Sequence, residues 1–149
     1  MRHEYIDGFV YAMVGARNAH NLIASNVLVS MGLQLKGRPC RAFNSDTKVR
    51  VRMTSHVRFY YPDAMVVCHQ NPQDQTFQDA PVLIVEVMSE STRRLDDGEK
   101  RDAYFTIPSL THYVLLNQNA AAAIVYERQG DEFIRTLYTT PTDVNRSAG

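Results

Sequence analysis

Two acidic residues stand where the chain is otherwise apolar. Glu86 lies inside PVLIVEVM, the most apolar run of the sequence, and Asp63 follows Tyr61-Pro62 at the start of another apolar run. An ionised carboxylate buried without a partner is energetically costly, so Glu86 needs a compensating group. Two carboxylates on neighbouring strands can hold Mg²⁺ while the ion keeps several waters. A salt bridge from Glu86 to an arginine and a turn role for Asp63 are the structural alternatives.

Lys100 adds a cation to this chemistry. It follows the acids of the segment Asp96-Asp97-Gly98-Glu99 near an expected helix N-terminus, where the helix dipole disfavours a lysine by ~0.3–1 kcal/mol. A lysine in such a place indicates another use, such as stabilising charge that develops on a substrate. The alternative is a solvated lysine beside Glu99 that contributes little to stability.

A basic segment offers contacts to phosphate. Residues 36–58 carry seven lysines and arginines against one acid, although the whole chain has 16 Lys and Arg and 16 Asp and Glu. Lys48, Arg50 and Arg52 alternate with apolar residues, which predicts a strand with one cationic face. Such a face can follow a phosphate backbone without reading sequence. A solvated outer face that discourages strand pairing is the alternative.

Hydrophobic spacing predicts the elements that position these side chains. We expect a hairpin over 3–14 that turns at Asp7-Gly8, a helix over 17–36, and a second helix over 91–107 capped by Asp97. The apolar side of the first helix is expected to contain Leu22, Ile23, Val27, Val29, Met31 and Leu33. Strands are expected over 47–53, 63–68, 81–88, 111–116, 121–127 and 132–138.

This order of elements predicts the α/β class at its boundary with α+β, with a mixed central sheet flanked by helices and an N-terminal hairpin. The 81–88 strand is apolar on both faces, which predicts a central position. With 149 residues, 44% of them hydrophobic, the chain has enough material for one core. We therefore expect one domain over residues 1–140 and a polar tail over 141–149.

Charge and cysteine content limit the partners and the cellular compartment that we expect for this protein. The net charge is zero, so any preference for nucleic acid must be local. The N-terminus has no apolar signal segment and no run approaches the ~18 apolar residues of a membrane span, so we expect neither secretion by that route nor a membrane partner. Cys40 and Cys68 have no CxxC spacing, which predicts neither a disulfide framework nor a zinc site. A reducing cytoplasm is the expected compartment.

Several segments in a fixed order carry a resemblance to a known family. They are EYIDG, His20 at the opening of a long helix, FNSDTKVRV, YYPDAMVV, PVLIVEVMSEST, and DDGEKRDAY followed by IPSLTHYVLL. From about Glu4 to Tyr126 the chain resembles the Uma family of proposed restriction endonucleases, a branch of the PD-(D/E)XK nuclease superfamily. This resemblance implies a restriction-endonuclease-like fold with Asp63 and Glu86 as the metal carboxylates.

The resemblance also implies roles for other residues. The superfamily usually has a lysine two residues after the second acid, where this chain has Met88. The Uma branch takes its lysine from the following helix, which here implies Lys100. His20 is implied as a hydrogen-bonding neighbour of the acids and Glu4 as a further candidate for the same cluster, although His20 alone would be a helix-entry residue. Family members usually continue beyond the EYIDG-like hairpin on its N-terminal side, whereas this sequence starts almost at it.

The expected function is therefore a metal-dependent DNA endonuclease that uses Mg²⁺ or Mn²⁺, with Asp63, Glu86 and Lys100 as its catalytic residues. The alternative is a nucleic-acid-binding or protein-interaction module that keeps the fold without turnover. One site for each chain favours a homodimer, which can address both strands of a duplex. The C-terminal strands offer an apolar patch for it, formed among others by Tyr113, Val114, Ile124, Val125, Phe133 and Ile134.

Overall fold

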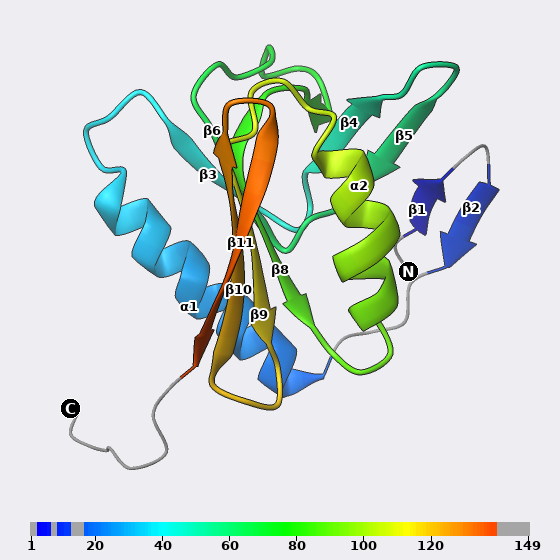
Figure 1. Cartoon of the computed structure of the whole chain (residues 1–149). Coiled ribbons are helices and arrows are strands. Elements are labelled where there is room, and N and C mark those ends of the chain that lie inside the picture. Colours follow the sequence, from blue (N-terminus) through cyan, green and yellow to red (C-terminus); the bar gives the residue numbers. More distant parts are fainter. Residues whose placement is uncertain (1–2, 7–8, 13–16, 140–149) are drawn as a thin grey trace.

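The computed structural model describes residues 3–6, 9–12 and 17–139, and it places two β-sheets beside two helical segments (Figure 1). In this part of the chain, the larger sheet has six strands in the order β11-β10-β9-β8-β6-β3. The smaller sheet has five strands in the order β2-β1-β5-β4-β7. The expected mixed class with a central sheet, flanking helices and an N-terminal hairpin is confirmed.

The larger sheet has β8 in its interior. Its strands are β3 (Arg41–Asn44), β6 (Ala64–Val67), β8 (Pro81–Met88), β9 (His112–Asn117), β10 (Ala122–Gln129) and β11 (Glu132–Thr139). β8 and β9 run parallel, whereas the other neighbouring pairs are antiparallel. The expected central position of β8 is confirmed, because residues 84–88 are all buried and strands lie on both sides. Glu86 is therefore an interior residue.

The smaller sheet begins with the expected hairpin. Its strands are β1 (His3–Ile6), β2 (Phe9–Ala12), β4 (Lys48–Arg52), β5 (Val57–Tyr60) and β7 (Phe77–Gln78). The turn at 7–8 lies outside the described residues. In β4 the predicted alternation holds, because Val49 and Val51 are fully buried. Strands β3, β5 and β7 have only two to four residues each and show no pattern in the sequence that predicts them.

The helix α1 (Asn18–Gln34) lies near its predicted bounds but presents a different face to the sheet. Ile23, Val27 and Met31 are half-buried, and α1 packs near β3, β6 and β8. Leu22, Val29 and Leu33, which were expected on the buried side, are 63–70% exposed. The expectation of one apolar face is therefore wrong for these three residues, because the sheet covers a narrower strip of the helix than the sequence pattern suggests.

The second helical segment departs from its expected start. A π-helical turn, η1 (Leu95–Glu99), runs directly into α2 (Lys100–Tyr104). Asp97 has φ −105° and ψ 41° inside this turn and is not a helix cap, which corrects the expectation. The Asp97 carboxylate instead accepts a hydrogen bond from the Tyr126 hydroxyl at 2.7 Å. The helical segment ends before Pro108, as expected.

The core lies between α2 and the two sheets. Tyr104 of α2 packs edge to face against Tyr60 and Tyr113, with ring centroids 5.3 and 5.2 Å apart. Much of the apolar patch expected for dimerisation belongs to this core, because Tyr113 and Ile124 are buried and Phe133 stacks on Phe105 at 3.9 Å. The expected tail at 141–149 lies outside the described residues.

Cys40 and Cys68 form a disulfide, which the sequence spacing did not indicate. Their neighbours Arg41 and Val67 are paired across β3 and β6, so strand register brings the two cysteines together. This disulfide corrects the expectation of no disulfide framework, and the reducing compartment that was inferred from it stays a prediction. Within residues 3–6, 9–12 and 17–139, no helix is long and apolar enough to cross a membrane.

Candidate active site

Asp63 immediately precedes β6 and is joined to β8. Its Oδ2 accepts a hydrogen bond of 2.7 Å from the main-chain N–H of Val87. Its own main-chain N–H donates to Oε1 of Glu86 at 3.3 Å. Pro62 has no N–H and is buried before it, so the chain enters β6 in a fixed direction. These bonds bring the two predicted acids together at the start of β6.

Glu86 is 3% exposed and is satisfied by several donors. The Tyr104 hydroxyl donates to Oε2 at 2.9 Å, and the Lys100 ammonium lies 3.4 Å from the same oxygen. The compensating cation is therefore this lysine from α2 rather than an arginine. Tyr104 was not identified from the sequence as a member of this site.

Lys100 lies between two carboxylates and is 4% exposed. Its Nζ is 3.4 Å from Glu86 Oε2 and 3.7 Å from Asp96 Oδ1, and it lies 5.6 Å from the centre of the Tyr60 ring. Asp96, also 4% exposed, was missed by the sequence argument. The available signal was its spacing, since Asp96, Lys100 and Tyr104 are four residues apart and share one helical face.

His20 in the first turn of α1 contacts the same site. Its Nε2 lies 3.2 Å from both carboxylate oxygens of Asp63, and its side chain is 19% exposed. The hydrogen bond to Asp63 raises the pKa of His20 above its usual value, and the smaller effect of burial opposes it. The structure therefore brings together Asp63, Glu86, Lys100 and His20.

Glu4 is placed only by its backbone. It lies in β1 opposite Tyr11 of β2, and β1 pairs with β5 through Tyr5 and Phe59. Its side chain is outside the described part of the chain, so its membership of the acidic cluster stays a prediction.

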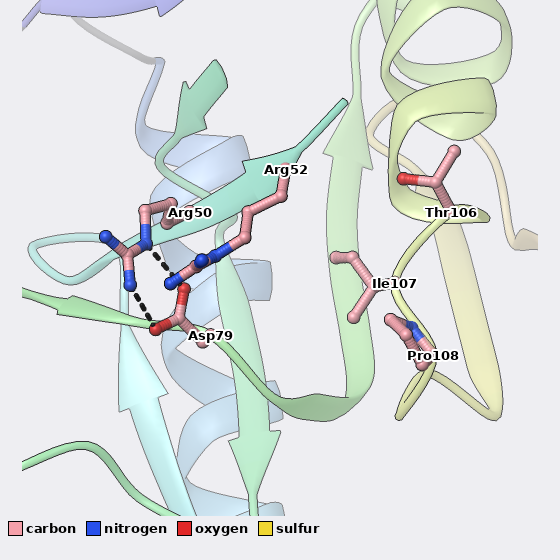
Figure 2. Close-up of a pocket in the computed structure, with 6 residues that line it drawn as sticks. All are labelled: Arg50, Arg52, Asp79, Thr106, Ile107 and Pro108. Carbon is pink, nitrogen blue, oxygen red and sulfur yellow. Dashed lines mark hydrogen bonds and ion pairs between the residues drawn. The ribbon is translucent and has the colours of Figure 1, made fainter. Parts of the chain in front are cut away.

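The basic side chains of β4 form a separate group. Arg50 makes two hydrogen bonds to Asp79, at 2.7 and 2.8 Å, and its guanidinium lies 4.3 Å from the centre of the Phe77 ring. Figure 2 shows Arg52 beside this pair in a pocket that shares no residue with the acidic cluster. Lys48 lies over the Phe59 ring at 5.5 Å. The pocket is lined by Arg50, Arg52, Asp79, Thr106, Ile107 and Pro108.

Comparison with known proteins identifies the family. The sequence profile of the Uma2 family, described as "Putative restriction endonuclease", matches residues 1–147. The chain belongs to the Uma2 family. Two uncharacterized proteins of Synechocystis sp. PCC 6803 are 33% and 31% identical to it over 131 and 133 residues. Those alignments cover 87% of this chain in both cases and 68% and 74% of the relatives.

A solved structure shares the fold. It is the crystal structure of "a putative nuclease belonging to DUF820" from Anabaena variabilis ATCC 29413, which is 17% identical and has a TM-score of 0.76. The similarity covers 93% of this chain and 77% of that protein. The Uma2 chain therefore has a nuclease-like fold.

The Uma2 site has more acids than one lysine can balance. Three carboxylates, Asp63, Glu86 and Asp96, are linked by contacts to Lys100 and His20. In the described ranges, no group of three or more His, Cys, Asp and Glu side chains is arranged to hold a metal ion. Proteins nevertheless usually bind Mg²⁺ through only one or two carboxylates, and the other ligands are waters and phosphate oxygens. The hard oxygen donors of Asp63 and Glu86 fit that chemistry.

Proposed function

We propose that this protein is a metal-dependent endonuclease that hydrolyses phosphodiester bonds in DNA. The observation that supports it most is the pair formed by the buried Glu86 and the partly buried Asp63, linked through the backbone and accompanied by a buried lysine. Membership of the Uma2 family supports the same class of activity. Buried charged groups of this kind are expensive for stability, so a functional role is the simplest reason for them.

Asp63 and Glu86 would hold Mg²⁺ or Mn²⁺ as carboxylate ligands. Such an ion lowers the pKa of a bound water and stabilises negative charge on a phosphoryl group. The main-chain N–H of Val87 fixes one oxygen of Asp63, and the Tyr104 hydroxyl fixes one oxygen of Glu86. Both acids are therefore oriented by the fold before substrate arrives, which is the requirement for a precise metal site.

Lys100 and His20 would act beside the acids. The Lys100 ammonium would stabilise charge at the scissile phosphate or orient the attacking water. His20 would hold Asp63 in position through its Nε2 contact, which makes it a positioning residue. The proposal gives Glu4 a place in this cluster as well, because β1 belongs to the same sheet as β5, the strand that leads into Asp63.

The DNA backbone would be contacted by the basic face of β4. Arg52 is exposed and Lys48 is half-exposed, whereas the Arg50 guanidinium donates two hydrogen bonds to the Asp79 carboxylate. Lys48 and Arg52 are therefore the stronger phosphate contacts within the expected set of three. Two copies of the chain, each with one site, would address the two strands of a duplex.

A nicking assay tests the proposal. Supercoiled plasmid and single-stranded DNA are incubated with the protein and Mn²⁺, beside the Asp63→Ala variant and an EDTA control. We expect Mn²⁺-dependent cleavage by the wild type and none by the variant. Cleavage that survives in Asp63→Ala rejects the site. DNA binding without Mn²⁺ binding or cleavage favours the alternative of a non-catalytic binding module.

A further inference from the structure

We propose that Asp96 is a positioning residue that receives the Lys100 ammonium when a divalent cation binds Asp63 and Glu86. The inference rests on the proposed function, because it assumes that metal site. It goes further by assigning a role to Asp96, the third carboxylate of the site, and by coupling metal binding to a movement of the Lys100 side chain.

The position of Lys100 is the first observation. Its Nζ lies 3.4 Å from Glu86 and 3.7 Å from Asp96, so a small movement transfers it from one carboxylate to the other. All three side chains are almost fully buried. A cation bound by Glu86 repels a nearby ammonium, and a buried lysine that leaves Glu86 needs another anion within reach. Asp96 already lies within reach, since its Oδ1 is 3.7 Å from the Lys100 Nζ.

Glu86 has hydrogen-bond donors that remain in place when Lys100 moves away. The Tyr104 hydroxyl donates to the same Oε2 that Lys100 approaches, at the shorter distance of 2.9 Å. Oε1 accepts from the main-chain N–H of Asp63. Each oxygen of Glu86 therefore keeps a neutral donor after Lys100 moves, and only the ion pair has to be replaced.

The backbone of Asp96 is held by hydrogen bonds at both its N–H and its carbonyl. The Tyr113 hydroxyl donates to the Asp96 carbonyl oxygen at 2.6 Å, and the Asp96 N–H donates to the Thr92 carbonyl at 2.9 Å. Burial raises the pKa of Tyr113 well above its usual value, which keeps this hydroxyl a donor. These bonds hold the backbone that carries the Asp96 carboxylate, and they do not depend on where the Lys100 ammonium lies.

Asp97→Asn provides a matched control. Asp97 is the next residue in the same π-helical turn, and its carboxylate contacts Arg101 at 3.3 Å and Tyr126 at 2.7 Å instead of Lys100. Both asparagine variants remove one charge without changing side-chain size. A general effect of charge or of the turn would therefore appear in both variants.

The test is calorimetric titration with Mn²⁺ alone. We expect Asp96→Asn to bind Mn²⁺ about tenfold more weakly than the wild type, the loss typical for a supporting partner of a metal ligand, and Asp97→Asn to bind as the wild type does. We also expect Lys100→Met and the double variant Asp96→Asn with Lys100→Met to bind with similar affinities, because Asp96 acts through Lys100.

The outcomes separate the two hypotheses. Failure of the wild type to bind Mn²⁺ overturns the proposed metal site, and the role of Asp96 with it. Wild-type affinity in Asp96→Asn, or an equal loss in the Lys100→Met background, overturns the role of Asp96 alone. Near-ultraviolet circular dichroism shows whether each variant folds, and the Lys100→Met pair still decides if Asp96→Asn does not.

Discussion

Asp63 and Glu86 are connected by a hydrogen bond from the main-chain N–H of Asp63 to Oε1 of Glu86, 3.3 Å long. The bond joins the residue before β6 to a residue in the C-terminal half of β8, and these two strands are adjacent and antiparallel. Because the contact uses the backbone of Asp63, its carboxylate remains available for other partners. The relative positions of the two acids therefore follow from strand pairing and not from any pairing of their charges.

The first prediction concerns the two acids as metal ligands. Asp63→Asn and Glu86→Gln keep hydrogen-bonding atoms in place but remove one charge each, so we expect each variant to lose at least about hundredfold in Mn²⁺ affinity. The unfolding midpoint of Glu86→Gln should fall, because Glu86 is paired with the buried Lys100 ammonium and the variant leaves that charge without this partner. Asp79→Asn, which affects the Arg50 pair, should bind Mn²⁺ normally. Undiminished binding in either acid variant would exclude that acid as a ligand.

The second prediction concerns Lys100. Lys100→Met removes an ammonium that stabilises charge at the phosphate, so turnover should fall by about a hundredfold or more. Mn²⁺ affinity should stay the same or increase, because the ammonium no longer competes for Glu86. Single-turnover cleavage and calorimetry measure the two quantities, with Lys36→Met, at an exposed lysine outside β4, as the matched control for loss of a lysine. Wild-type turnover in Lys100→Met would make Lys48 the next candidate.

The third prediction is a pH dependence of stability caused by His20. The pKa of His20 is raised in the folded protein, so its protonated form contributes stability that is fully present below the unfolded value of about 6.5. That contribution is lost as the pH rises through the folded pKa. Urea unfolding of wild type and His20→Gln in EDTA should show a difference that shrinks as the pH increases. The exposed His69→Gln is the control, and a constant difference would contradict the interpretation.

The sequence predicted the acids of the site because they break a local pattern. Glu86 interrupts an apolar strand, and Asp63 follows a proline at a strand entrance, so both are anomalous without knowledge of their neighbours. Asp96 has no such anomaly, since it stands in an acidic run. Such a run is typical of the solvent-exposed first turn of a helix. Only the π-helical turn, in which Asp97 leaves helical geometry, shows that Asp96 points inward.

Tertiary pairing explains most of the remaining differences. The Cys40–Cys68 disulfide depends on the register of β3 against β6, which no spacing of cysteines encodes. The exposed Leu22 of α1 depends on how much of the helix the sheet covers. The short strand β7 depends on a parallel partner in β4 for its existence. Each of these features requires contacts between segments that local periodicity does not describe.

The fourth prediction concerns the disulfide. It closes a loop across a sequence separation of 28 residues, so removing it should lower the free energy of unfolding by about 3–4 kcal/mol through the gain of unfolded-state entropy. We expect dithiothreitol to lower the unfolding midpoint of the wild type and to leave the Cys40→Ser, Cys68→Ser double variant unchanged. Insensitivity of the wild type to the reductant, together with two titratable thiols, would show that the cysteines are unpaired.

The fifth prediction is a homodimer formed through β11. Among the strands that the structure describes, β11 is at an edge of the larger sheet, and Ile134 and Tyr138 on one of its faces are 43% and 58% exposed. Edge strands offer unpaired backbone groups, and a two-fold axis beside β11 would satisfy them in both copies at once.

Light scattering at micromolar concentration should give twice the chain mass of 16.9 kDa, and Ile134→Lys should reduce it to the single-chain value. Leu22→Lys, which places the same charge on the exposed side of α1, is the control and should remain dimeric. A wild-type mass of one chain would reject the dimer, and dissociation by Leu22→Lys alone would move the interface to α1.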